Sequence, residues 1–309
     1  MAKNRLNYLV YAAPYDANSG GAIFLHQLAH HLGALGEDVS LWSWIAPPPE
    51  PHARRRVGVP PIGKTLASLE LNPDLNTRCA VPKDLRKDTI VIYPEVTLGN
   101  PLKAKNIVRW LLYTPGVKDP YEFTEDEMFF RAGEMSDLPD LTGGAPDLFV
   151  WRRDRTYRNE NRPDREGACY IVRKGFDKPR IPQTEDAICI DGLPHDQIAE
   201  IFNHCKTFYS YDEATFYSQY AAVCGCTSVV VPGRFQSRED WVANHPIGRV
   251  GVAYGLNDVA HAEATRHLVE EHLDQLERNG LDSVRNFVSL TQARFTAASR
   301  PKLFSLFRR

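Results

Sequence analysis

The sequence lacks any long apolar run and any strong excess of charge. No apolar stretch among its 309 residues approaches the roughly 20 residues that a membrane-spanning helix needs. The 37 Lys and Arg residues nearly balance the 39 Asp and Glu residues, so the formal net charge is −2. This small charge provides no overall attraction to nucleic acid or to an anionic membrane surface.

Cysteine is scarce, and its spacing matches neither a zinc site nor a small disulfide scaffold. The six cysteines are scattered, and Cys224 and Cys226 are too close together for a C-x-x-C ligand pair. We therefore expect reduced, buried thiols and a cytoplasmic setting. The chain also has no solenoid repeat, Walker loop or G-x-S-x-G elbow, which argues against repeat proteins, P-loop enzymes and α/β-hydrolases.

Strands and helices alternate through the first half of the chain. Leu6–Ala13 is predicted to be a buried strand, the apolar spacing of Ala22–Leu35 predicts a helix, and Val39–Trp44 predicts a second strand. Thr89–Tyr93 and Ile107–Tyr113 read as further buried strands, each followed by a loop that contains proline.

The same alternation resumes after a densely charged segment. Trp151–Gly167 contains six arginines and almost no aliphatic residue, and it is expected to be an exposed linker between domains. Strands are expected at Ala168–Arg173, Ala187–Ile190, Thr207–Tyr211, Ser228–Val231 and Val250–Tyr254, and helices at Pro194–Cys205, Phe216–Val223, Asn257–Arg278 and Leu281–Ala298. This order predicts an α/β protein with two Rossmann-like, doubly wound domains that face each other across a cleft.

The stretch Lys206–Gly233 combines a strand, a polar loop, a small-residue helix and a second strand. Asp212 and Thr215 lie in the loop, where the carboxyl end of the strand meets the helix. Open α/β sheets build ligand sites at such strand ends, and free N–H groups at a helix start suit a phosphate. Thr215 and Asp212 are also ordinary helix-capping residues, so a purely structural role is the alternative.

Three segments resemble the GT-B glycosyltransferases, in particular the large retaining group called family 4. Ser19-Gly20-Gly21-Ala22 resembles the opening glycine loop and helix of that family. Tyr170-Ile171-Val172-Arg173-Lys174-Gly175 is similar to the strand that begins its C-terminal domain and supplies basic groups to a diphosphate. Ala221-Ala222-Val223-Cys224-Gly225, with the strand Ser228–Val231 after it, resembles its nucleotide-sugar motif.

The resemblance implies sugar transfer from a nucleotide-sugar donor to a hydroxyl acceptor, with retention, without a metal and without a cofactor. It implies residues 1–160 as the acceptor-side domain, 161–285 as the donor-binding domain, and 286–309 as a C-terminal helix that crosses back to the first domain. The acceptor is expected to be a glycan, a lipid-linked molecule or a small molecule. A nucleic acid acceptor, such as a modified DNA base, is the less favoured alternative, suggested by the arginines at positions 152, 153, 155, 158, 162 and 165.

Site residues are assigned on this basis, each with a structural alternative. Glu95, Arg173 and Lys174 are the catalytic candidates: the cations would stabilise the diphosphate leaving group, and Glu95 is a candidate base. The donor-binding candidates are Gly20, Gly21, Asp212, Glu213, Thr215 and Tyr217.

One position departs from the family pattern. The group carries two glutamates in its last motif, and the matching positions here are Asp212 and Tyr220. A tyrosine cannot accept two hydroxyl hydrogen bonds as a carboxylate can, so Glu213, backbone groups or Thr215 would have to take over. The alternatives are a GT-B enzyme resembling a sugar-nucleotide epimerase, and an inactive nucleotide-binding module.

Overall fold

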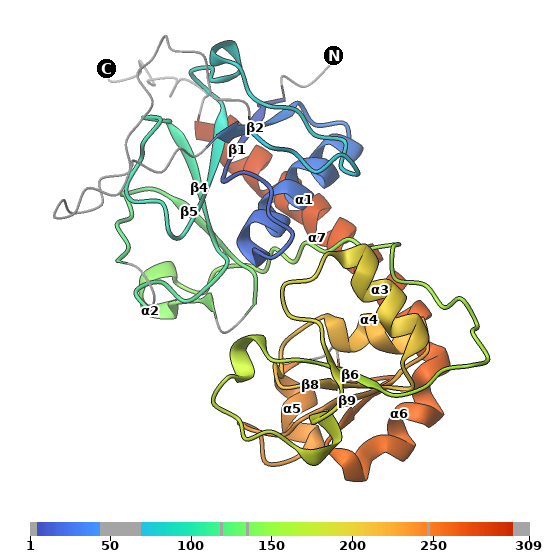
Figure 1. Cartoon of the computed structure of the whole chain (residues 1–309). Helices are drawn as coiled ribbons and strands as arrows, with labels where there is room; N and C mark the ends of the chain where they lie inside the picture. Colours follow the sequence, from blue (N-terminus) through green and yellow to red (C-terminus); the bar gives the residue numbers. More distant parts are fainter. Residues whose placement is uncertain (1–4, 44–68, 118–119, 134–135, 246–247, 299–309) are drawn as a thin grey trace, which may run out of the picture. The chain divides into compact units, whose positions relative to one another are not determined.

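A computed structural model describes residues 5–43, 69–117, 120–133, 136–245 and 248–298. The chain divides into two compact units (Figure 1). Unit 1 comprises residues 1–152 and 277–309, and unit 2 comprises residues 153–276. Residues 299–309 of the predicted C-terminal helix lie outside the described residues.

Unit 1 contains a five-stranded sheet in the order β2-β1-β3-β4-β5, and every neighbouring pair is parallel. Its strands are β1 Tyr8–Ala12, β2 Val39–Ser43, β3 Ile90–Pro94, β4 Asn106–Leu111 and β5 Met128–Arg131, and its helices are α1 Gly20–Ala34 and the short α2 Pro139–Thr142. Near-continuous apolar strands such as β1 are typical of parallel sheets buried on both faces.

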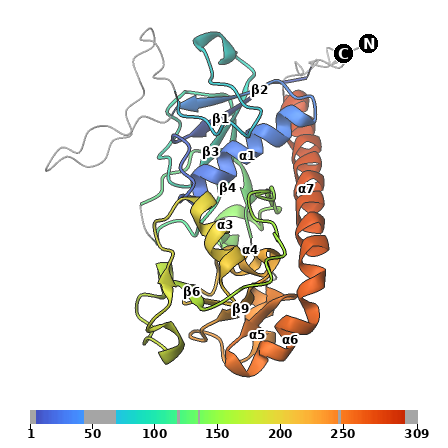
Figure 2. The ribbon, with the colours of Figure 1, turned by 45° about the vertical axis from the view of Figure 1, so that its right-hand side comes forward.

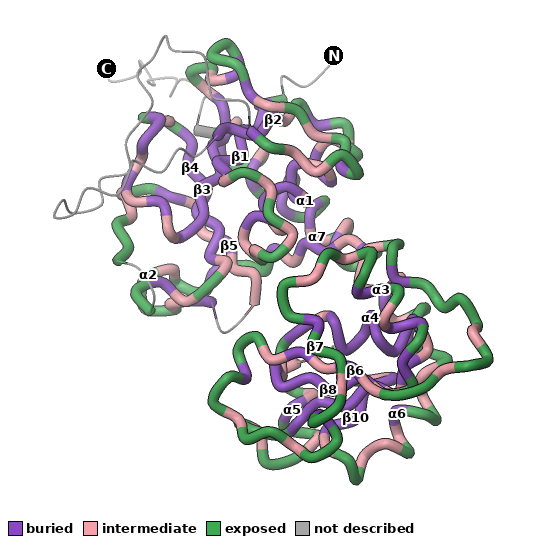
Figure 3. The backbone as a smooth tube through the Cα atoms, in the orientation of Figure 1, coloured by how far each residue is buried: buried purple, intermediate pink, exposed green. Residues whose placement is uncertain are grey.

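Different elements cover the two faces of this sheet. One face packs against α1 and against the later part of α7 Val269–Ala298, which contributes Val284, Phe287, Val288 and Phe295 to the core. The other face is covered by irregular segments that bring Ala80, Leu85, Leu102 and Ala104 against Tyr11 and Tyr93. Strands β1, β3 and β4 are buried along their whole length (Figure 3).

Unit 2 contains a second five-stranded parallel sheet, in the order β10-β9-β8-β6-β7. Its strands are β6 Ala168–Ile171, β7 Ile188–Cys189, β8 Thr207–Ser210, β9 Thr227–Val230 and β10 Val252–Tyr254. Its helices are α3 His195–His204, α4 Tyr217–Cys224, α5 Arg238–Asn244 and α6 Val259–Thr265. The two Rossmann-like α/β units predicted from the sequence are thus confirmed.

Two predictions about this part of the chain need correction. The segment Trp151–Gly167 is exposed only in part, because Trp151, Arg153 and Tyr157 are buried. The helix expected at Asn257–Arg278 is divided into α6 and the start of α7, and α7 runs on through Gly280 to include the helix expected at Leu281–Ala298 (Figure 2). A Cβ at Gly280 would lie 3.1 Å from the backbone N and O of Trp151, so the glycine permits a close crossing of two segments and does not end the helix.

Candidate functional site

Arg173 stands in a strained turn at the carboxyl end of β6. Its φ of +41° lies in the left-handed region, which is uncommon for a residue with a side chain. The backbone N–H groups of Val172 and Arg173 donate to the Asp191 carboxylate at 2.8 and 3.1 Å. A Cβ at Gly175 would lie 2.1 Å from the carbonyl oxygen of Tyr211, so this turn is packed tightly against the chain after β8. Strain held in place by its surroundings is a mark of functional sites.

The structure brings Arg173 together with two of the predicted donor-binding residues. Its Nε lies 4.0 Å from Oδ2 of Asp212, and its guanidinium lies 5.7 Å from the centre of the Tyr217 ring. The Arg173 side chain is 34% exposed, so it can still reach a ligand. Asp212 is buried and also accepts the backbone N–H of Ala214 at 3.0 Å, so it shapes the loop as well as facing the arginine.

Lys174 and Thr215 differ in how firmly they are held. Lys174 is exposed beside Arg173. Thr215 is buried, and its hydroxyl accepts the N–H of Tyr217 at 3.3 Å at the start of α4. This bond joins residues two positions apart and is a local turn contact, while the N-cap of α4 is Phe216.

Glu213 links the loops that follow β8 and β9. It accepts from the Tyr254 hydroxyl at 2.7 Å and from the Gly233 N–H at 3.0 Å, and it lies 3.4 Å from Nζ of Lys178. Burial alone would raise the pKa of Glu213, but these donors and the N–H of Arg234 hold that pKa below its ordinary value. A carboxylate with this many partners organises the edge of the sheet.

Tyr220, the position that departs from the family pattern, is a core residue. Its ring stacks on that of Tyr157 with centroids 4.2 Å apart and an angle of 3° between the planes. The side chain is buried, and burial raises the pKa of its hydroxyl.

Two residues that the sequence did not single out complete this edge of unit 2. Asp154 Oδ2 lies 3.4 Å from Nδ1 of His195, and the Tyr157 hydroxyl lies 2.8 Å from the same nitrogen. Nε2 of His195 lies 3.5 Å from the hydroxyl of Tyr217. Burial would raise the pKa of Asp154, but hydrogen bonds from His195 and Thr156 hold that pKa below its usual range. A histidine at the start of a predicted helix was the one local signal for this group.

In unit 1, Gly20 and Gly21 form the first turn of α1, which Ser19 caps by accepting the Ala22 N–H at 3.4 Å. A Cβ at Gly20 would meet no heavy atom within 4 Å, and one at Gly21 would meet only Leu112, at 3.8 Å. The fold therefore leaves room for side chains at both positions, and packing does not explain the two glycines.

Glu95 follows β3 and is buried. Its carboxylate accepts the backbone N–H of Leu112 at 2.9 Å. Burial raises the pKa of Glu95, against the backbone donors that favour the charged form. A raised pKa is the direction that suits a carboxylate acting as a base near neutral pH.

A buried arginine shapes the loop that carries Glu95. Arg109 pairs with Glu127 through two contacts of 2.8 Å, and neither side chain is exposed to solvent. The same guanidinium donates to the carbonyl oxygens of Thr97 and Gly99 at 2.6 and 2.8 Å. The loop after β3 is thus held by a buried ion pair whose guanidinium also hydrogen-bonds to the loop backbone.

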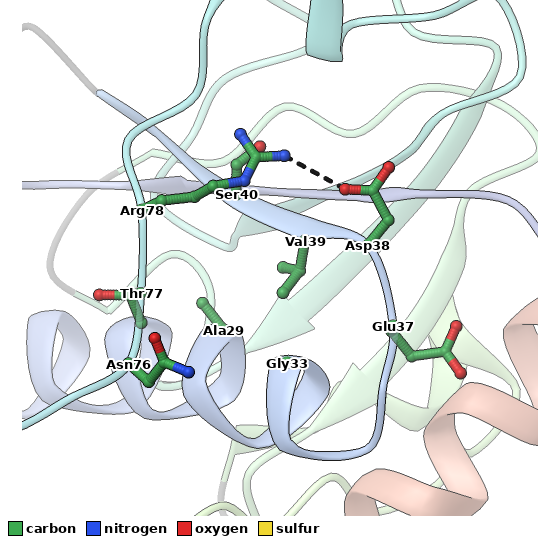
Figure 4. A pocket seen from close by; sticks show the side chains of 9 residues that line it. All are labelled: Ala29, Gly33, Glu37, Asp38, Val39, Ser40, Asn76, Thr77 and Arg78. Atoms are coloured by element: carbon green, nitrogen blue, oxygen red, sulfur yellow. Dashed lines mark hydrogen bonds and ion pairs between the residues drawn. The ribbon is translucent and has the colours of Figure 1, made fainter.

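A hollow in unit 1 lies away from Glu95 and from the glycines of α1. It has a volume of about 220 Å³ between α1, the start of β2 and residues 76–78, and the Arg78–Asp38 ion pair of 3.1 Å crosses its rim (Figure 4). It contains none of the predicted site residues and lies at the amino end of β2, whereas ligand sites of α/β sheets form at carboxyl ends.

Within the described ranges, no group of three or more His, Cys, Asp or Glu residues is placed to hold a metal ion. Over the same ranges, no helix is long and apolar enough to cross a membrane. His26 and His30 share a face of α1, but His26 bonds to the carbonyl oxygen of Ala13 at 2.9 Å and His30 accepts the N–H of Asn76 at 3.0 Å.

No protein-family model and no curated protein sequence matches the chain. Among solved structures, the chain is similar to the glycosyltransferase SnogD from Streptomyces nogalater, with a TM-score of 0.39, 10% identity, and coverage of 93% of this chain and 100% of that one. It is also similar to MurG from Acinetobacter baumannii, with a TM-score of 0.36, 12% identity, and coverage of 93% and 99%. At these scores the site has to be judged from its own residues.

Proposed function

We propose that the chain is a glycosyltransferase that moves a sugar from a nucleotide-sugar donor to a hydroxyl acceptor, with retention of configuration. Unit 2 would bind the donor through Arg173, Lys174, Asp212 and Tyr217. Unit 1 would contribute Glu95 on the acceptor side, and the open first turn of α1 would admit a phosphate or an acceptor group.

The observation that carries this proposal is the turn at Arg173. A left-handed arginine is held by Asp191 and keeps a third of its side chain exposed at the carboxyl edge of a parallel sheet. Lys174 adds a second, exposed cation next to it. A guanidinium on a strained turn beside an exposed ammonium is a suitable receptor for a diphosphate, since charge-assisted bonds to phosphate are strong.

The chemistry of the transfer requires cations at this point. The bond between the anomeric carbon and the diphosphate oxygen breaks, and its electron pair leaves with the diphosphate. Arg173 and Lys174 would stabilise that growing negative charge, which is a role that a metal ion plays in other sugar transferases. The acceptor oxygen bonds to the anomeric carbon on the same face, and its proton passes to the departing phosphate oxygen.

Glu95 would then position the acceptor hydroxyl as a hydrogen-bond acceptor. Its burial and its raised pKa suit a carboxylate that works close to neutral pH. Gly20 and Gly21 would allow a ligand to approach the backbone N–H groups at the start of α1.

A second candidate is a nucleotide-binding module without catalysis. It is favoured by Tyr220, whose ring is stacked in the core where the resembling family has a carboxylate. This candidate shares the anion site with the enzyme and differs from it only in turnover.

The deciding experiment measures binding and transfer on the same protein. Nucleoside diphosphates are screened by thermal denaturation, where saturation at a hundred times Kd stabilises by about 2.7 kcal/mol. Sugar nucleotides are then tested for transfer and hydrolysis, with and without EDTA, against glycan, lipid-linked, small-molecule and duplex DNA acceptors.

The matched variants are Arg173→Ala and Arg180→Ala. Arg180 is also a cation near this edge, but its guanidinium lies 4.7 Å from the centre of the Tyr170 ring and 4.8 Å from that of Tyr211. We expect Arg173→Ala to abolish the ligand-induced stabilisation and Arg180→Ala to retain it. Binding without turnover selects the inactive module, and a protein that neither binds nor turns over any sugar nucleotide contradicts the proposal.

A further inference from the structure

Asp154 and His195 form a bonded pair that the transfer scheme above leaves without a role. Their side chains approach to 3.4 Å and remain 35% and 28% exposed. Both side chains are therefore partly accessible to solvent while they contact each other.

The segment that carries Asp154 is anchored from behind. Its neighbour Arg153 is buried and binds Glu270 at 2.7 Å and Asp274 at 3.0 Å, both near the start of α7. Arg155 reaches Asp274 as well, at 3.2 Å. Because the residues on both sides of Asp154 are tied to one helix, its carboxylate is held in place toward His195.

His195 is anchored by aromatic residues. The Tyr157 hydroxyl lies 2.8 Å from its Nδ1, and the Tyr157 ring is fixed in turn by stacking on Tyr220. The imidazole also packs against the Tyr217 ring, with centroids 5.8 Å apart. Tyr220, which stands where the resembling family has a glutamate, thus packs against Tyr157, and Tyr157 orients His195.

One tyrosine side chain separates this pair from the candidate diphosphate site. The hydroxyl of Tyr217 lies 3.5 Å from Nε2 of His195, while the Arg173 guanidinium lies 5.7 Å from the centre of the same ring. The charges of Arg173 and Asp154 both act on the Tyr217 hydroxyl. A ligand whose phosphate binds Arg173 would place its next ring within reach of the pair.

The chemistry of the pair indicates what that ring carries. A carboxylate can accept hydrogen bonds from two adjacent hydroxyls. The imidazole of His195, whose two ring nitrogens contact the hydroxyls of Tyr157 and Tyr217, positions that carboxylate. We propose that Asp154 and His195 form a subsite for a ring with vicinal hydroxyls, the ribose or the hexose of the anionic ligand. This subsite rests on the proposed function and supplies the carboxylate that the chain lacks at Tyr220.

The test compares ligands with and without such a ring. Calorimetry with pyrophosphate, UDP, 2′-deoxy-UDP and glucose 1-phosphate is carried out on the wild type, Asp154→Asn and His195→Ala. His204→Ala is the control, because His204 ends the same helix and is exposed. We expect Asp154→Asn and His195→Ala to bind UDP about tenfold more weakly than the wild type, which corresponds to the loss of one charge-assisted hydrogen bond. Their affinity for pyrophosphate should not change, and His204→Ala should bind all the ligands as the wild type does.

The arms of the experiment separate the two sources of the ring. A loss seen with UDP but not with 2′-deoxy-UDP assigns the subsite to ribose, and a loss with glucose 1-phosphate assigns it to the hexose. Equal weakening of pyrophosphate, or no weakening of any ligand by either variant, overturns the subsite while leaving the anion site intact. A wild type that binds neither pyrophosphate nor UDP overturns the proposed function and the subsite with it.

Discussion

Replacing Arg173 by glycine and by alanine separates the strain of its backbone from the charge of its side chain. At φ of +41°, a residue with a Cβ pays about 1–2 kcal/mol that glycine avoids. At an ordinary position, glycine is about 0.5–1 kcal/mol less stable than alanine because it loses more backbone entropy. The difference between these terms makes Arg173→Gly more stable than Arg173→Ala by about 0.5–1 kcal/mol.

Lys174 is the matched control, because it is the next residue of the same turn and its φ is not in the left-handed region. There we expect the usual order, with Lys174→Gly less stable than Lys174→Ala. Urea denaturation of the four variants measures both differences. Both Arg173 variants should bind pyrophosphate about ten- to a hundredfold more weakly than the wild type, since each has lost the same guanidinium.

Two results would refute this reasoning separately. If glycine is less stable than alanine at both positions, the backbone of Arg173 holds no strain. If the Arg173 variants bind pyrophosphate as the wild type does, the guanidinium is not part of an anion site. A stabilised Arg173→Gly variant without binding would show that the native turn trades stability for function.

Three further predictions concern stability. Gly175→Ala should destabilise unit 2 by about 1–3 kcal/mol or more in urea denaturation, because its Cβ would overlap the carbonyl oxygen of Tyr211 at 2.1 Å; an unchanged midpoint contradicts this packing. Arg109→Met should cost about 3–5 kcal/mol by leaving Glu127 buried without its partner, and adding Glu127→Gln should recover part of the loss; purely additive losses would argue against the pair. Burial raises the pKa of Glu95, so the folded wild type keeps this proton to a higher pH than the unfolded chain and loses stability as pH rises from the ordinary carboxyl range to the raised pKa. The free energy of unfolding of Glu95→Gln should therefore increase relative to that of the wild type between acid and neutral pH. A difference between the two proteins that does not change with pH would contradict this prediction.

Much of the fold follows from local patterns in the sequence. The strand expected at Thr207–Tyr211 is β8 Thr207–Ser210, and the strand expected at Ser228–Val231 is β9 Thr227–Val230. These segments are short runs of apolar and β-branched residues bounded by polar ones, and a strand buried on both faces has that composition.

The elements that escaped prediction carry weak local patterns. β5 Met128–Arg131 is an edge strand of four residues, of which only Phe130 is buried. α5 Arg238–Asn244 buries a single side chain, Trp241, which stacks on Tyr254. One buried residue produces no apolar periodicity, and the local signal that the sequence does carry is the N-cap Ser237, which accepts the N–H of Asp240 at 3.1 Å.

The site was predictable only as far as it is local. Arg173 and Asp212 each follow a strand, and parallel strands bring their carboxyl ends to one edge of a sheet, so their proximity could be inferred. Asp154 stands in an arginine-rich segment that resembles a solvated linker, and its partner His195 comes much later in the chain. Nothing in the spacing of these two residues indicates that they meet.

Tyr220 shows how a mismatch in sequence can be structural in origin. If only its carboxylate had been lost, the tyrosine would be expected to face solvent at the ligand edge, and Tyr220→Glu would restore the family pattern. Instead its ring stacks flat on Tyr157, whose hydroxyl bonds to His195. A glutamate there would remove the stacked ring and bury a charge, so Tyr220→Glu should destabilise the packing of Tyr157 and His195 and should not create a ligand contact. In the proposed subsite a second carboxylate, beside that of Asp212, would instead come from Asp154, which lies in another segment of the chain and contacts His195 at 3.4 Å.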